Sequence, residues 1–149
     1  MSIRIKELDS NELLRQVLLN ERNIKDYKIN YSKNGKPFLV DSDIYFNYSR
    51  SNSLTALVTS KIKNGICIKH YFYDEKIMDE SFNEKEKNIV ENSKDKKVAF
   101  TEIYTLKIAY LKMNDYDKNY SLKNIDTSTL KNWEKISNNE YIVSVIYDK

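Results

Sequence analysis

The segment Ile44–Tyr73 reads IYFNYSRSNSLTALVTSKIKNGICIKHYFY. Ile, Phe and Tyr at positions 44, 46 and 48 alternate with Tyr45 and Asn47, a short apolar run covers residues 54–60, and alternation returns over residues 65–73. A period of two is typical of β-strands, because successive side chains point to opposite faces of a sheet. The last strand places Ile66 and Ile68 on one face and Cys67 and Lys69 on the other. The segment therefore predicts three successive strands.

The flanking sequence alternates between strand and helix patterns. Lys33–Pro37 has the composition of a turn between two short strands. Helical spacing of apolar residues begins after Ser10, which we expect to cap the first helix, and returns in the second half of the chain. The helices are expected at Glu12–Arg22, Ser81–Ser93 and Val98–Met113, and the remaining strands at Tyr27–Tyr31, Phe38–Val40, Ser121–Ile125, Leu130–Ile136 and Tyr141–Tyr147. These elements predict one α+β domain over residues 1–149.

Composition excludes several classes of protein. The 149 residues carry 25 Lys and Arg against 22 Asp and Glu, and a net charge of +3 spread along the chain does not indicate a nucleic-acid partner. Two glycines, Gly35 and Gly65, are too far apart to form a phosphate-binding loop, and one cysteine excludes a disulfide framework. The apolar runs are too short to span a membrane, and Met1–Leu13 is too charged for a signal peptide. We expect a cytoplasmic protein with no membrane partner.

Five short fragments follow one another along most of the chain: Gly35–Phe38, Phe46–Ser51, Asn64–Lys69, Phe82–Glu86 and Tyr104–Lys112. They are similar, in this order, to the motifs Gly-Lys-Pro, Phe-Asn-Ile-Ser-His-Ser, Ile-Gly-Ile-Asp-Ile-Glu, Phe-Ser-x-x-Glu and Trp-Thr-x-Lys-Glu-x-x-x-Lys. These are the motifs of the Sfp-type 4'-phosphopantetheinyl transferases, which the chain therefore resembles. Each fragment alone is weak, but together they span most of the chain in the family's order.

The resemblance implies a fold and a chemistry. Enzymes of this family move the phosphopantetheine arm of coenzyme A to a serine of a carrier protein, and coenzyme A lies between two similar α+β halves. The chain is then an abbreviated member whose two small halves, about 1–62 and 63–149, pack as one compact unit. In the family, three carboxylates hold a magnesium ion at the positions matched here by Cys67, Lys69 and Ile108. None of these side chains is a ligand that magnesium prefers, so we expect no metal at this site.

The positions that contact phosphate in relatives are better preserved. The resemblance assigns phosphate contacts to Lys36, Ser49 and Lys112, and Arg50 stands where the family has a histidine. Arginine still binds phosphate through its planar guanidinium group. Lys69 places a positive charge where the metal would be. These five residues form the expected binding site, and we expect it to take an anion, coenzyme A being the candidate, without magnesium.

The resemblance therefore predicts a catalytically impaired relative of the transferases. We expect it to act as a binding or accessory partner of a carrier protein or of an active enzyme. Two alternatives stay open. The first is an active transferase with a shifted magnesium site that recruits Asp74, Glu75 or Glu102. The second is an α+β interaction protein unrelated to the family.

Overall fold

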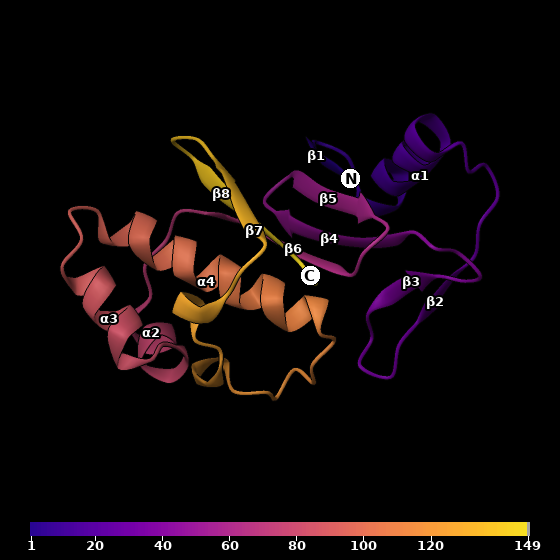
Figure 1. Ribbon diagram of the computed structural model, residues 1–149. Helices are drawn as coiled ribbons and strands as arrows, with labels where there is room; N and C mark the ends of the chain where they lie inside the picture. Colours follow the sequence, from indigo (N-terminus) through magenta and orange to yellow (C-terminus); the bar gives the residue numbers. More distant parts are fainter. Residues whose placement is uncertain (149) are drawn as a thin grey trace.

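The computed structural model describes residues 1–148, so that Lys149, the last residue of the expected second half, lies outside the described residues. The first sheet is antiparallel, with strand order β1 (Ser2–Lys6), β5 (Leu54–Ser60) and β4 (Tyr45–Ser51). A separate hairpin pairs β2 (Ile29–Tyr31) with β3 (Pro37–Leu39). The α+β class is confirmed, and the arrangement is shown in Figure 1.

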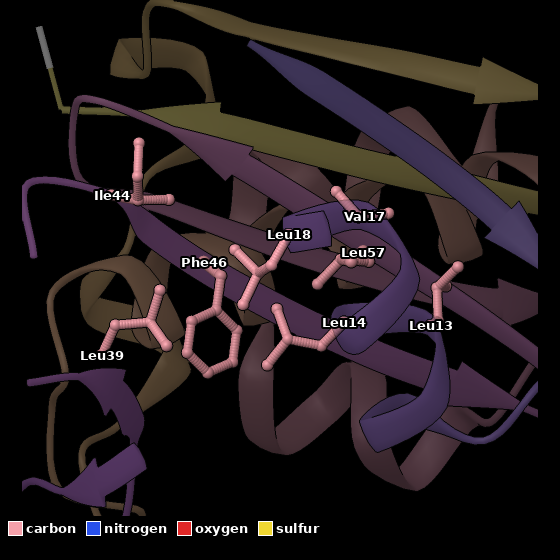
Figure 2. Close-up of a cluster of buried hydrophobic side chains, with 8 residues drawn as sticks. All are labelled: Leu13, Leu14, Val17, Leu18, Leu39, Ile44, Phe46 and Leu57. Carbon is pink, nitrogen blue, oxygen red and sulfur yellow. The ribbon is translucent and has the colours of Figure 1, made fainter. Parts of the chain in front are cut away.

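Helix α1 (Ser10–Arg22) covers one face of the first sheet. Its buried leucines and valine pack against Phe46 and Leu57, as Figure 2 shows. Asp9, and not Ser10, caps the helix, because its carboxylate accepts a hydrogen bond from the Glu12 N–H at 3.0 Å. Both residue types favour this position, so the pattern alone left the boundary one residue uncertain.

The second sheet is also antiparallel, with strand order β6 (Asn64–His70), β8 (Tyr141–Tyr147) and β7 (Trp133–Ser137). Helix α4 (Lys96–Met113) covers its outer face, and the shorter helices α2 (Glu75–Ser81) and α3 (Glu84–Glu91) pack beside α4 around Phe82 and Phe100. In the part of the chain that the structure describes, no helix is long and apolar enough to cross a membrane.

Two predictions for the second half were wrong. Ser81–Ser93 is not one helix: α2 ends at Ser81, and Asn83 begins α3 with a reciprocal cap to Glu86. Ser121–Ile125 is not a strand but contains the 3-10 turn η1 (Leu122–Asn124), which precedes a second turn, η2 (Thr127–Thr129). The strands expected at 54–60 and 141–147 are confirmed at both ends.

The inner faces of the two sheets enclose a second apolar core. Ala56 and Val58 of β5 meet Ile66 and Ile68 of β6, with Val143 and Val145 of β8 completing the cluster. The opposite face of β6 carries Gly65, Cys67 and Lys69, since alternate residues share a face. This second face is directed at α4.

Gly65 allows α4 to approach β6 closely. A Cβ atom at this position would lie 2.0 Å from the Ala109 carbonyl oxygen and 2.8 Å from the Met113 nitrogen, both backbone atoms that cannot rotate away. The glycine therefore fixes the distance between the helix and the strand.

We expect Gly65→Ala to lower the free energy of unfolding by about 3 kcal/mol or more, because the helix must move away from the sheet. Gly35→Ala is the matched comparison: its Cβ would meet nothing within 4 Å, but its φ of +90° disfavours a side chain, so about 1 kcal/mol is expected. Urea unfolding of both variants measures the difference. Equal losses would contradict the close approach.

Candidate functional site

The edge strands β4 and β6 meet along a seam that is closed by side chains. Three polar residues on the inner face of β4 accept hydrogen bonds from three alternate backbone N–H groups of β6. The bonds join Asn47 Oδ1 to Ile66 N (2.9 Å), Ser49 Oγ to Ile68 N (3.0 Å) and Ser51 Oγ to His70 N (3.1 Å). The strands do not pair directly, so these side chains replace a backbone ladder. We call this contact the β4–β6 seam.

Lys112 of α4 closes the same seam from the other side. Its ammonium donates to the carbonyl oxygens of Tyr48, at 2.5 Å, and Ile66, at 2.9 Å, one on each strand. Withdrawal from water lowers the pKa of Lys112 to about 8, with the charge of Lys69 adding to the effect. No carboxylate lies within ion-pair distance of Lys112 among residues 1–148.

Lys36 reaches the seam from the turn before β3. Its ammonium donates to the carbonyl oxygens of Asn64, at 3.2 Å, and Met113, at 3.4 Å. Burial lowers the pKa of Lys36 to about 8; Asp115 opposes this shift, whereas Lys112 and Lys63 reinforce it. Two desolvated lysines therefore lie at one end of the seam.

A pocket of about 350 Å³ opens beside these two lysines. The hairpin turn is tied to the loop after α4 by Asn34, whose side chain donates to the Asp115 carbonyl at 2.7 Å. Tyr116 of this loop stacks on Tyr120 with their ring centres 4.3 Å apart. The lining residues are Asn34, Gly35, Lys36, Pro37, Asn47, Tyr48, Leu111, Lys112, Asp115, Tyr116 and Lys118. We call this hollow the lysine pocket.

The five expected site residues do not all meet there. Lys36 and Lys112 line the lysine pocket, and Ser49 lies at the seam with its hydroxyl accepting the Ile68 N–H. Arg50 is exposed, and it points to the opposite face of β4 because it neighbours Ser49 on a strand. Lys69 shares the α4-facing side of β6 with Cys67 and is close enough to Lys112 to depress its pKa.

Of the three positions that match the family's metal ligands, Cys67 and Lys69 lie on the side of β6 that faces α4, and Ile108 lies on α4 itself. Cys67 is buried and Ile108 packs against the apolar cluster around it. Burial raises the pKa of the Cys67 thiol. Over the described residues, no three histidine, cysteine, aspartate or glutamate side chains are grouped so that they could hold a metal ion.

The carboxylates considered for a shifted metal site have other partners. Asp74 caps α2 by accepting the Ile77 N–H at 3.0 Å, and Glu102 forms an ion pair with Lys135 at 3.0 Å. Glu75 is exposed in the first turn of α2.

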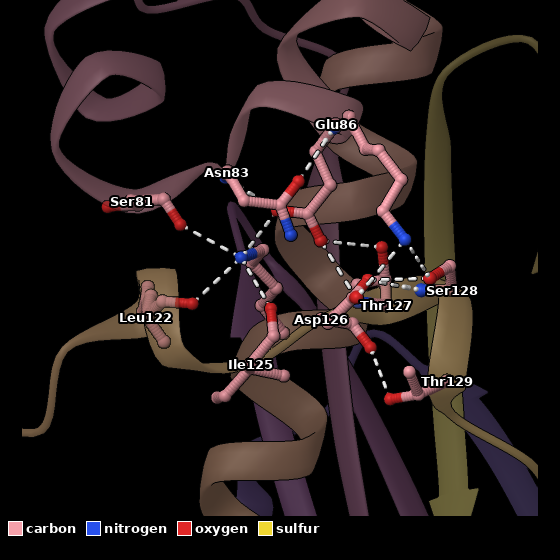
Figure 3. Close-up of polar contacts among 11 residues, drawn as sticks. Ser81, Asn83, Glu86, Leu122, Ile125, Asp126, Thr127, Ser128 and Thr129 are labelled. Carbon is pink, nitrogen blue, oxygen red and sulfur yellow. Dashed lines mark hydrogen bonds and ion pairs between the residues drawn. The ribbon is translucent and has the colours of Figure 1, made fainter.

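A buried ion pair joins the segment Phe82–Glu86 to the segment Tyr104–Lys112. Lys107 and Glu86 approach to 2.6 Å, and both side chains are withdrawn from solvent. The Lys107 ammonium also donates to three carbonyl oxygens, and Glu86 accepts from Asn83 and Thr127, as Figure 3 shows. The carbonyls belong to Ser81, Leu122 and Ile125. Because every donor and acceptor is satisfied, this network holds the loops around α4 and leaves neither charge free for a ligand.

Sequence reasoning did not assign Asn47, Ser51, Glu86 or Lys107 a role. The signal for the first two was present: small polar residues at 47, 49 and 51 alternate with Phe46 and Tyr48, so that one face of the strand is polar and the other apolar. The Glu86–Lys107 pair lacked a local signal, since its members are 21 positions apart.

We expect Ser49→Ala to lower the free energy of unfolding by about 1–2 kcal/mol, because it leaves the Ile68 N–H without an acceptor. Hydrogen exchange of the Ile68 amide should become about tenfold faster. Ser53→Ala, in the exposed turn between β4 and β5, is the control and should change neither quantity. Unchanged protection at Ile68 in the Ser49 variant would contradict the seam.

Comparison with models of known protein families and with curated protein sequences finds no match to this chain. The resemblance to the phosphopantetheinyl transferases therefore rests on the five fragments alone.

Proposed function

We propose that the protein is a non-catalytic relative of the phosphopantetheinyl transferases that binds the phosphate end of coenzyme A, without magnesium, in the lysine pocket. It then serves as an accessory partner of a carrier protein or of an active transferase. The observation that carries the proposal is the presence of two desolvated lysines, Lys36 and Lys112, in one pocket with aromatic walls.

The electrostatics of the lysine pocket favour an anion. Neither Lys36 nor Lys112 has a carboxylate partner within ion-pair distance in the described chain, and Lys118 lines the same hollow. Asp115 is the one acidic residue of the lining. A phosphate would supply the counter-charge that the two buried ammonium groups lack, and such charge-assisted bonds are strong where water is excluded.

The shape of the pocket suits one end of a nucleotide-like molecule. Its apolar wall is formed by Pro37, Tyr48, Leu111 and Tyr116. A volume of about 350 Å³ lies at the lower end of the range for small-molecule sites, so part of coenzyme A would remain outside. Bases stack on aromatic side chains and phosphates bind cationic groups, so an aromatic wall beside lysines suits a flat ring joined to phosphate.

The side chains around Cys67 do not support transfer chemistry. Breaking the phosphoanhydride of coenzyme A in the family's way needs a metal ion and a base that activates the acceptor serine. The buried Cys67 thiol and the packed Ile108 side chain provide neither. The proposal is therefore one of binding, and the choice of a carrier protein or an active transferase as partner rests on the sequence resemblance.

Calorimetry with coenzyme A in the absence of magnesium tests the proposal. We expect saturable binding, and we expect Lys36→Met to weaken it by about tenfold or more, because a charge-assisted bond to phosphate is lost. Lys94→Ala, which removes an exposed lysine between α3 and α4, should bind as the parent does. Pantetheine, which lacks the phosphates, should bind at least tenfold more weakly. Absence of coenzyme A binding to the folded parent would overturn the proposal.

A mass measurement separates this proposal from the active alternative. The protein is incubated with magnesium, coenzyme A and an apo carrier protein. We expect no change in the mass of the carrier protein, whereas transfer would add the phosphopantetheine arm of about 340 Da. Appearance of the adduct would show that the protein is an enzyme.

The affinity for coenzyme A should fall as the pH rises through about 8. The free pocket holds two lysines whose pKa values burial lowers to about 8, and only the protonated form attracts phosphate. The loss should approach tenfold per pH unit above 8 for each lysine that must gain a proton. Titrations between about pH 7 and pH 9.5 measure it. Solvated lysines would retain their charge throughout this range, so a constant affinity would contradict binding at Lys36 and Lys112.

A further inference from the structure

Three of the four edges of the two three-stranded sheets accept or donate side-chain hydrogen bonds at their backbone within residues 1–148. The edges of β4 and β6 are joined in this way across the seam. On β1, Arg4 donates to the Ile3 carbonyl at 2.9 Å and is tied to Glu21 of α1. For β7, the fourth edge, no side chain bonds to the backbone of Trp133–Ser137 within residues 1–148, and β8 is its one strand partner there.

The register of β7 defines which backbone groups are free. Tyr147 N–H donates to the Asn132 carbonyl at 3.0 Å, so the even-numbered residues of β7 are those bonded to β8. The N–H and C=O groups of Trp133, Lys135 and Ser137 therefore face away from the sheet. An open edge of this kind accepts a further strand.

A hollow of about 250 Å³ lies beside β7 on the face covered by α4. Its apolar lining includes Ile103, Leu106, Trp133 and Ile89, of which Ile89 is 56% exposed. The charges at its rim are already paired, since Lys85 contacts Asp126 at 3.3 Å. This outer hollow therefore suits an uncharged, apolar side chain.

A second hollow, of about 310 Å³, lies at the start of β7. It is lined by Met1, Ile62, Trp133, Glu134 and Tyr147, with Asn132 at its margin. Tyr147 is only 8% exposed and its hydroxyl has no hydrogen-bond partner. Glu134 is exposed and forms no ion pair in the described chain. This inner hollow offers a free carboxylate and a free hydroxyl acceptor, which suit a cationic side chain.

A second copy of the chain does not complement this edge. Antiparallel pairing of β7 with itself about Lys135 sets two lysines opposite one another, which is unfavourable. Pairing about Ile136 instead sets Asn139 opposite Trp133. About Lys135, Ser137 lies opposite Trp133 and Ile136 opposite Glu134. Neither register therefore brings an apolar side chain to the outer hollow or a basic one to the inner hollow.

We propose that β7 binds an extended peptide segment of a partner protein, which adds to the second sheet as a strand. An apolar side chain of the peptide, opposite Trp133, enters the outer hollow. The neighbouring residue, opposite Glu134, is a lysine or arginine that enters the inner hollow between Glu134 and Tyr147. Because neighbouring residues of a strand point to opposite faces, one apolar–basic pair fills both hollows.

This inference does not depend on the lysine pocket, which lies at the end of the seam and involves neither β7 nor its hollows. A five-residue strand buries a small area, so the complex belongs to the weak, transient class. Its affinity comes from backbone bonds and its specificity from the two side chains.

The test is a displayed library of peptides of about ten residues selected against the full chain, followed by NMR titration of the selected peptides with labelled protein. We expect enrichment of an apolar–basic pair and shifts of the amides of Trp133, Lys135 and Ser137. N-methylation of alternate peptide residues, which removes their N–H groups but keeps the side chains, should weaken binding by about tenfold or more.

Lys135→Pro removes one outward N–H of β7, and Lys135→Ala keeps it, although both lose the ion pair with Glu102. We expect the proline variant, but not the alanine variant, to bind the selected peptides about tenfold more weakly. Glu134→Gln should weaken peptides that carry the basic residue and leave those with alanine in its place unaffected. No selected binder at about 1 mM, insensitivity to N-methylation, or self-association through β7 in sedimentation would each overturn the proposal.

Discussion

The β4–β6 seam is the contact on which the rest of the structure depends. Each of the two sheets ends there in an edge strand, and a buried N–H without an acceptor would cost about 1–3 kcal/mol. Asn47, Ser49 and Ser51 provide three acceptors at the spacing of the strand pleat. The same register brings the inner faces of β5 and β6 together over one apolar core. It also sets the position of β6 under α4, where Gly65 permits close contact.

The lysines of the seam satisfy carbonyl oxygens and retain capacity for a ligand. An ammonium group has three donors. Lys112 uses two of them on Tyr48 and Ile66, and Lys36 uses two on Asn64 and Met113. One donor and the whole charge of each side chain remain. A long side chain with several donors can therefore close the seam and face the pocket at once, so a structural role for these lysines does not compete with the binding role that we propose.

The sequence predicted strands and helices well where the pattern was local and apolar. The runs at 54–60 and 141–147 are strands with the expected ends, because most of their side chains are buried. The prediction failed at two places where polar contacts decide the structure. Asn83 caps a new helix and so interrupts the helix expected over 81–93. Residues 121–125 turn so that the Leu122 and Ile125 carbonyl oxygens accept hydrogen bonds from Lys107. Of the predicted site residues, Lys36 and Lys112 line one pocket, whereas Arg50 points away from Ser49. The opposite directions of Ser49 and Arg50 follow from the alternation of side chains along a strand. A comparison of motifs position by position does not consider the direction of side chains, so it placed both residues in one site.

In the function that we propose, the residues at the family's metal positions change the charge of the site so that an anion can be held without a metal ion. In the family three carboxylates and a divalent cation together carry one net negative charge, and the metal is needed before a phosphate can approach. Here Cys67 and Ile108 are uncharged and Lys69 is cationic, so the same region carries a net positive charge with no metal. On this proposal, the absence of the three carboxylates removes the means of activating the phosphoanhydride and also removes the negative charge that would repel a phosphate. The proposed site therefore holds its ligand and does not turn it over.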